Sequence, residues 1–204
     1  MKRSTTSAGS PGFTLIELLA VIAIIGILVT LISPVITKAQ FQAKVTKEAT
    51  KARGIVEAIM AKQAASRFSN GWPSSDPASR DYYGSATEFL ASLIEDGYLD
   101  VDYSYFAGPG QTPALSKDDF SSANNMWYVV QDLNDSVPGN TPAVFTRNLN
   151  IDDLSFDTSQ PLGDKGFAFA TKNGEAIAVF KKEMADSEVF EAIFRTNGVP
   201  VLEP

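Results

Sequence analysis

The sequence predicts an α+β protein in which one long N-terminal helix packs on a small antiparallel sheet with short extra helices. Two observations support this fold class. An apolar run over residues 13–36 continues into an amphipathic helical pattern over 37–70. Near the C-terminus, Asn173-Gly174 separates two apolar stretches, which indicates a β-hairpin. We therefore divide the chain into a polar leader (1–12), the apolar helix, its amphipathic continuation, and a globular outer domain (71–204).

The composition excludes several classes of function. The formal net charge is -7, from 17 basic and 24 acidic side chains, and an acidic protein is a poor partner for nucleic-acid phosphates. The chain has no cysteine and no histidine, so Ser-His-Asp and Cys-His nucleophile sites and Cys/His zinc sites are excluded. We expect a protein that is not an enzyme and has no catalytic, cofactor or metal site.

The apolar run is long enough to cross a membrane. At helical rise it spans about 36 Å, against a hydrocarbon core of about 30 Å. A secretory signal peptide has a shorter apolar core followed by small residues at its cleavage site, which does not fit here. Lys2 and Arg3 precede the run, so the positive-inside tendency keeps the N-terminus cytoplasmic and sends the C-terminus outward.

Glu17 is the single ionisable residue of this run. A carboxylate in hydrocarbon costs about 2.5–3.5 kcal/mol, so it is normally paired, protonated or functional. One interpretation is that Glu17 lies a turn from the interface and snorkels. If the chain is cut after Gly12, a second becomes available, because Phe13 then carries an ammonium four residues before Glu17 on the same helix face. A neighbouring molecule could supply the same ammonium, which gives a physical route to assembly.

The segment Gly12-Phe13-Thr14-Leu15-Ile16-Glu17-Leu18, followed by the apolar helix, resembles the prepilin signature of type IV pilins and type II secretion pseudopilins. The resemblance is close over residues 9–40 and looser beyond. It implies a pilin-like fold, cleavage by a prepilin peptidase between Gly12 and Phe13, and methylation of Phe13. It also implies that Glu17 guides insertion of the subunit next to the N-terminal amine of an adjacent one.

Gly26 and Pro34 are the weak points of the predicted helix. Glycine costs up to about 1 kcal/mol relative to alanine in a helix. Proline lacks an N–H, and the ring of Pro34 crowds the carbonyl of Thr30. We predict at least a kink, and the resemblance implies that the segment between the two residues extends or melts in an assembled filament.

The amphipathic half predicts two different faces. An apolar stripe is expected to pack on the sheet of the same chain, and it consists of Val45, Ala49, Ala52, Val56 and Ile59. Lys44, Lys47 and Lys51 occupy another side. These lysines form a solvated face, or alternatively they meet acidic surfaces of neighbouring subunits in a filament.

The outer domain contains one short helix and several strands in our prediction. A capping box at Ser85–Glu88 begins a helix that Asp96-Gly97 ends, a unit that resembles a segment of major pseudopilins. Strands are expected over 126–133, 143–147 and the hairpin 166–181. Both faces of that hairpin are apolar, so we expect it to be central and buried, with Phe167, Phe169, Ala176, Ala178 and Phe180 on one face. A last helix is expected from Asp186 or Ser187 to Asn197-Gly198.

A polar loop over 148–164 contains Asn150, Asp152, Asp153 and Asp157. Acidic loops of this kind bind calcium in some pseudopilins, but no spacing here matches the EF-hand pattern. We interpret it as a solvated loop, with calcium unsupported by a specific motif.

The predicted function is that of a structural subunit of a type II secretion pseudopilus. Its expected partners are a prepilin peptidase, copies of itself, other pseudopilins and the inner-membrane assembly platform. The expected location is the bacterial inner membrane, single-pass, with the globular domain periplasmic or extracellular. Many type IV pilins close a C-terminal loop with a disulfide, which this chain cannot form, and the presence of Glu17 argues against a pseudopilus tip subunit. The alternatives are a major or minor type IV pilin in adhesion, motility or DNA uptake, and a membrane-anchored binding module that does not polymerise.

Overall fold

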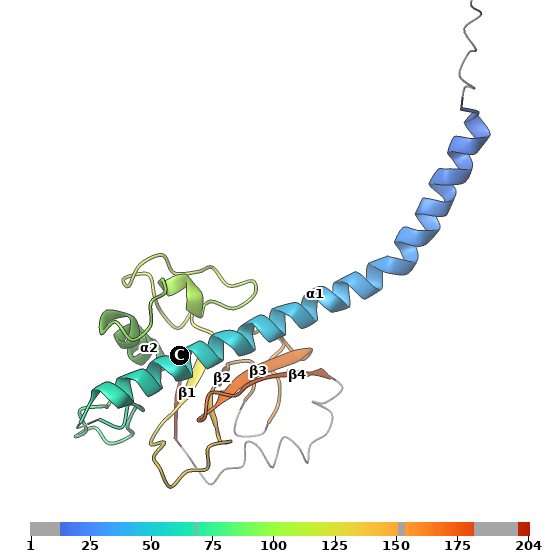
Figure 1. Ribbon diagram of the computed structural model, residues 1–204. Helices are drawn as coiled ribbons and strands as arrows, with labels where there is room; N and C mark the ends of the chain where they lie inside the picture. Colours follow the sequence, from blue (N-terminus) through green and yellow to red (C-terminus); the bar gives the residue numbers. More distant parts are fainter. Residues whose placement is uncertain (1–12, 68, 151–153, 182–199) are drawn as a thin grey trace, which may run out of the picture. The chain divides into compact units, whose positions relative to one another are not determined.

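The computed structural model describes residues 13–67, 69–150, 154–181 and 200–204. The chain divides after Phe41 into two compact units, which are described separately below. The expected α+β, pilin-like layout is confirmed: a long N-terminal helix packs on a five-stranded antiparallel sheet accompanied by short helices (Figure 1). The leader 1–12 and the predicted C-terminal helix lie outside the described residues.

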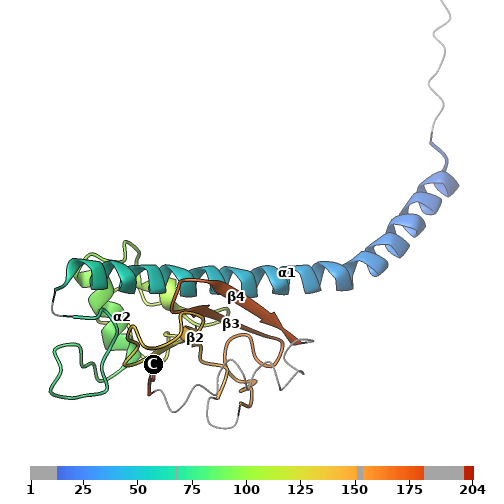
Figure 2. The ribbon, with the colours of Figure 1, turned by 60° about the horizontal axis from the view of Figure 1, so that its bottom comes forward.

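Helix α1 is continuous from Leu15 to Ala65. Both Gly26 and Pro34 lie inside it, and the predicted kink and melting stay predictions. In the second unit the apolar stripe is buried as expected, and the sheet lies beneath this part of the helix (Figure 2). The buried apolar residues of α1 are Val45, Ala49, Ala52, Ile55, Val56, Ala58 and Ile59. The 3.6-residue period therefore fixed which face of the helix contributes to the core.

Helix α2, Ala86–Glu95, begins and ends as its sequence predicts. The Ser85 side chain accepts a hydrogen bond from the Glu88 N–H at 3.2 Å, which satisfies one of the free donors of the first turn. At the other end, Gly97 adopts φ 77° and the Tyr98 N–H donates to the Leu93 carbonyl at 2.9 Å. That arrangement is a Schellman motif, for which glycine is the favoured residue. A short 3₁₀ helix, η1 (Tyr103–Phe106), follows and was not predicted.

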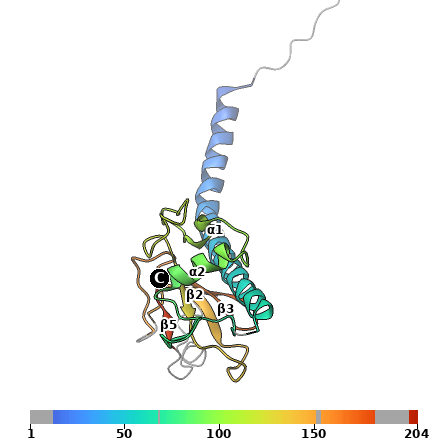
Figure 3. The ribbon, with the colours of Figure 1, turned by 90° about the vertical axis from the view of Figure 1, so that its left-hand side faces the viewer.

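The sheet has the order β4-β3-β2-β1-β5, with every neighbouring pair antiparallel. The strands are β1 (Trp127–Val130), β2 (Pro142–Thr146), β3 (Gly166–Thr171), β4 (Ala176–Phe180) and β5 (Val201–Leu202). Strand β5, which is labelled in Figure 3, pairs with β1 and was missed in the sequence, because two residues are too few to carry a periodic signal. Strand β1 ends before Asp132, whose φ of 56° is incompatible with extended backbone.

The register predicted for the β3–β4 hairpin is wrong by one residue. A two-residue type I′ turn would require positive φ at both Asn173 and Gly174. In the structure only Gly174 is left-handed, with φ 81°, and Ala170 pairs with Ala176, so the loop contains one residue more. Phe167 consequently pairs with Val179 and Phe169 with Ile177. The two phenylalanines therefore do not share a face with Phe180, Ala176 and Ala178.

The hairpin is also less central than expected. Strand β3 is buried along its whole length, but β4 forms an edge of the sheet and is only partly buried. Large aromatic side chains from the loops, α2, η1 and the strands fill the core: Trp72, Phe89, Phe106, Trp127, Phe145, Phe167 and Phe169. The second unit therefore has an aromatic core of its own.

Candidate functional site

The first candidate region is the start of α1. Phe13 is the first described residue and its side chain is 76% exposed, whereas Gly12 lies outside the described residues. Every residue from 13 to 40 is exposed, although most are apolar. Of the helices that the structure describes, α1 alone is long and apolar enough to cross a membrane. The segment fits a single-pass membrane anchor.

Glu17 forms a reciprocal capping box with Thr14. The Thr14 N–H donates to Glu17 Oε2 at 2.8 Å, and the Thr14 hydroxyl donates to the same oxygen at 2.7 Å. The Glu17 N–H lies 3.3 Å from Thr14 Oγ1 and donates to it. Thr14 is thus the N-cap of α1 and Glu17 its third helical residue. The carboxylate also lies where the helix dipole favours negative charge.

This second role of Glu17 was missed in the sequence, although the signal was present. Thr14-Leu15-Ile16-Glu17 has the same Ser/Thr-x-x-Glu spacing that correctly located the start of α2. The two donors from Thr14 are neutral and both reach Oε2. In the described part of the chain no cation pairs with Glu17, so its hydrogen bonds are satisfied at one oxygen while its charge is not compensated.

Gly26 has no packing role within the described chain. A Cβ built at this position meets no other atom within 4 Å, so alanine would fit without a clash. The φ of Gly26 is helical and requires no glycine. What distinguishes the position is the low helix propensity of glycine, and its role as a weak point of the helix stays a prediction.

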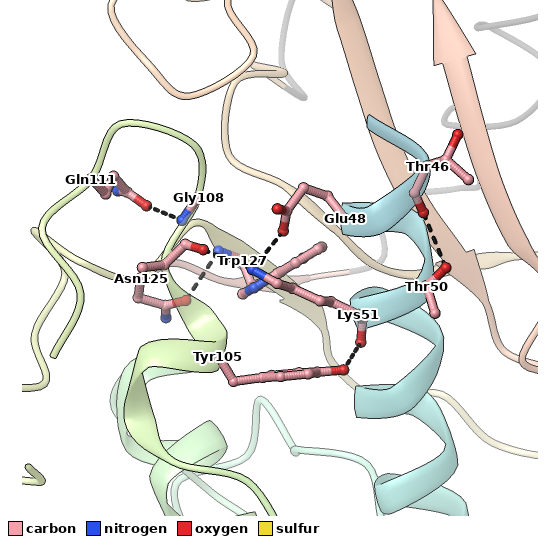
Figure 4. Close-up of polar contacts among 10 residues, drawn as sticks. Thr46, Glu48, Thr50, Lys51, Tyr105, Gly108, Gln111, Asn125 and Trp127 are labelled. Atoms are coloured by element: carbon pink, nitrogen blue, oxygen red, sulfur yellow. Dashed lines mark hydrogen bonds and ion pairs between the residues drawn. The ribbon is translucent and has the colours of Figure 1, made fainter. Parts of the chain in front are cut away.

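The second candidate region is a cluster on the buried side of α1 (Figure 4). It belongs to the second compact unit, Gln42–Pro204, which we call the outer unit. Glu48 is 3% exposed, and its Oε2 lies 3.0 Å from Lys51 Nζ, as an ion pair rather than a well-aligned hydrogen bond. Lys51 Nζ also donates to the Ala107 carbonyl at 2.9 Å, while the Tyr105 hydroxyl donates to the Lys51 carbonyl at 2.9 Å. The cluster therefore joins the helix to the 105–107 segment.

Burial dominates the electrostatics of this cluster. Desolvation raises the pKa of the Glu48 carboxyl, and the adjacent Lys51 ammonium offsets part of that rise. Desolvation, followed by the negative charges of Glu48 and Glu57, raises the pKa of Tyr105 to about 12. Trp127 Nε1 is buried nearby without a hydrogen-bond partner. The arrangement is that of a structural tie, because one ion pair and two hydrogen bonds connect residues of α1 with each other and with the 105–107 segment.

The polar loop over 148–164 is described only in part. Asp157 accepts two hydrogen bonds from Ser159, from the N–H at 2.8 Å and from the hydroxyl at 2.7 Å, and these bonds lower the pKa of its carboxyl. Asp152 and Asp153 lie outside the described residues. Within the described ranges, no three acidic, histidine or cysteine side chains come together as metal ligands.

Comparison with known proteins identifies the N-terminal region. Residues 9–33 match the family described as the prokaryotic N-terminal methylation motif, which is the signature of type IV pilins and pseudopilins. The matched range includes Gly12, Phe13 and Glu17. No curated protein and no solved structure matches this chain at a significant level. Together, the methylation motif and the fold support a pilin-like protein with a transmembrane-capable N-terminal helix.

Proposed function

We propose that this protein is a structural subunit of a type II secretion pseudopilus, anchored in the inner membrane and polymerised through α1. One observation carries the proposal: Glu17 lies uncompensated at the start of an exposed apolar helix, inside the N-terminal methylation motif. An uncompensated carboxylate in hydrocarbon is costly, and a cation that reaches it removes that cost.

Processing would supply the cation. In the uncut chain the Phe13 nitrogen belongs to a peptide bond and is uncharged. A prepilin peptidase that cuts after Gly12 converts it into an ammonium, which stays cationic when it is methylated. Glu17 Oε2 already accepts both bonds from Thr14, which leaves Oε1 as the oxygen open to an amine. That amine comes either from the same chain or from the neighbouring subunit, and the second case adds one subunit to the filament.

Charge pairing is needed because the apolar surface alone does not direct assembly. Lipid tails solvate a leucine- and isoleucine-rich helix as well as another helix does, so helices in a membrane gain little from hydrophobic contact. An ion pair in a medium of low dielectric is both strong and specific in position. Glu17 would therefore set the axial register between neighbouring subunits, and the outer unit would consolidate the contact outside the membrane.

The choice of a secretion pseudopilus over a pilus rests on composition. The chain has no cysteine, whereas many type IV pilins close a C-terminal loop with a disulfide. Glu17 favours a subunit within the filament rather than its tip. We propose copies of the chain, other pseudopilins, the prepilin peptidase and the assembly platform as partners, a periplasmic location for the outer unit, and no catalytic, cofactor or nucleic-acid role.

Deletion of the gene tests which system the protein serves. We expect the deletion strain to lose enzyme secretion and to keep surface motility, with secretion restored by the wild-type gene and not by Glu17→Val. Glu17→Val should still insert into the membrane, so its amount in the membrane fraction is the control. Loss of motility with normal secretion would instead identify a type IV pilin. If neither changes and the chain is never found in filaments, it is a binding module.

A further inference from the structure

A groove runs between α1 and the 101–113 segment of the outer unit. It consists of two adjoining hollows of about 610 and 470 Å³, and both are lined by Lys47, Lys51 and Ser104. The backbone of Gly108, Pro109 and Gly110 forms one wall of the smaller hollow.

Two lysines of this groove have no anionic partner in the described chain. Lys51 is engaged by Glu48 and the Ala107 carbonyl, but Lys44 and Lys47 are exposed and form no ion pair with any described residue. Helical steps of three and four residues place all three on one face of α1. The two carboxylates of the groove are both engaged, because Glu48 pairs with Lys51 and Asp102 caps η1 through the Ser104 N–H at 2.9 Å. In a chain with a net charge of -7, this groove is a cationic exception that suits a carboxylate ligand.

The same chain carries an acidic segment whose charge is opposite to that of the groove, and it ends in the turn Asp96–Asp100 after α2. Residues 84–102 include five carboxylates and no lysine or arginine. Three of the five have partners, because Glu88 accepts from the Gly84 N–H, Glu95 pairs with Lys117, and Asp102 caps η1. Asp96 and Asp100 are exposed and have no ion pair within the described ranges. They follow the C-terminus of α2, where the helix dipole adds further negative potential.

We propose that the groove at Lys44 and Lys47 of one copy binds the Asp96–Asp100 turn of the next copy. This inference rests on the proposed function, since it names the contact between outer units that consolidates the filament. A contact between two different surfaces of identical subunits does not close on itself in general and continues as an open helical assembly. Within one chain the turn adjoins the groove, because Asp100 directly precedes Val101 and Asp102, which line the larger hollow together with Lys47.

Cysteine cross-linking tests the contact directly, because the chain has no native cysteine. Lys47→Cys and Asp96→Cys are introduced into separate full-length chains, which are co-expressed in the membrane under conditions that permit assembly. We expect a disulfide-linked dimer only when both variants are present. A matched control pairs Lys47→Cys with Asp135→Cys, which replaces another exposed carboxylate. Equal cross-linking of the two pairs would overturn the proposal.

Charge exchange provides a second measurement on the same contact. Lys47→Glu and Asp96→Lys should each lower the yield of filaments at least tenfold, and their combination in one chain should restore most of it. Lys165→Glu, which makes the same charge change at another exposed lysine, should assemble normally. The proposal is wrong if the double variant stays as defective as the single ones. It is also wrong if Lys47→Glu assembles normally but binds vesicles that contain anionic lipid less well, because the groove is then a lipid site.

These outcomes separate this contact from the proposed function itself. Chains that are cut after Gly12 and form filaments, but do not cross-link at Lys47 and Asp96, refute the groove contact alone. Chains that stay uncut and monomeric refute the proposed function.

Discussion

At the scale of single residues, Glu17 caps helix α1 and also carries a charge that is available for pairing. It closes the capping box with Thr14 and thereby helps to begin α1. It also brings a negative charge that no described side chain neutralises. A cap requires an acceptor oxygen, while pairing with an N-terminal amine requires a charge, so the two tasks respond differently to substitution.

Glu17→Gln separates these tasks. The amide oxygen can still accept from Thr14, but the charge is lost, so we expect normal insertion and a filament yield at least tenfold below wild type. Thr14→Val removes the hydroxyl of the cap and keeps the charge. It should cost about 1 kcal/mol in helix stability and still assemble. Electron microscopy and quantification of sheared filaments measure the assembly of the two variants. If Glu17→Gln assembles as wild type does, the charge is not used and Glu17 acts through the cap alone.

The raised pKa of Tyr105 predicts how the stability of the fold depends on pH. Its pKa in the folded protein is about 12, above the value of about 10 for an unfolded chain, so the folded state holds the phenol proton more tightly. The stabilising contribution of this phenol is complete below about pH 10, and it is lost as the pH rises towards 12. Tyr105→Phe removes the bond to the Lys51 carbonyl, at a cost of about 1 kcal/mol near neutral pH.

Denaturant unfolding of the detergent-solubilised chain between pH 9 and 12 measures this effect. Tyr105→Phe should lose stability less steeply than wild type over the upper part of that range. The variant Tyr82→Phe, whose side chain is 43% exposed, should follow the wild-type profile. Parallel curves for wild type and Tyr105→Phe would contradict the assignment of a buried, hydrogen-bonded phenol.

At the scale of elements, the features set by local chemistry were predictable and those set by distant partners were not. The buried stripe of α1 and both ends of α2 follow from side-chain periodicity, the Ser85 cap and Gly97, all of which act within a few residues. The hairpin location was predictable for the same reason. Its register was not, because Asn173-Gly174 fits a two-residue or a three-residue loop and the local sequence does not distinguish the two.

The hairpin loop itself makes a testable prediction at this scale. Gly174 has φ 81°, and a Cβ added there meets no atom within 4 Å, so a substitution is opposed by backbone conformation alone. Gly174→Ala should destabilise the outer unit by about 1 kcal/mol, and Gly174→Asn by less, since asparagine tolerates the left-handed region. Thermal unfolding of the two variants beside wild type measures the difference. Equal stability of all three would contradict the observed loop.

The candidate site was also predictable only in part. Phe13 and Glu17 could be located because the prepilin signature is a local pattern, and the motif match over residues 9–33 includes both. Gly26 and Pro34 were located by their low helix propensity, and their role as weak points stays a prediction. The groove beside Lys47 could not be predicted in the same way. Its second wall comes from residues 101–113, which the fold of the outer unit brings to α1 through contacts such as Lys51 with Ala107.

At the scale of the whole molecule, the chain combines two units with different solvents. The first consists of an apolar helix that is fully exposed and suited to a bilayer. The second has its own aromatic core and an acidic composition suited to water. The apolar helix fits a single-pass membrane anchor, and in our account the cut after Gly12 creates the charge that allows neighbouring copies to engage Glu17.

The most direct test of that account is mass spectrometry of the chain purified from membranes of its native host. We predict a mature N-terminus at Phe13, carrying one methyl group on its nitrogen, and an uncut, unmethylated chain when the prepilin peptidase is absent. A membrane-bound chain that still begins at Met1, or that is cut at another position in the presence of the peptidase, would contradict the central claim, because Glu17 would then have no processed amine to pair with.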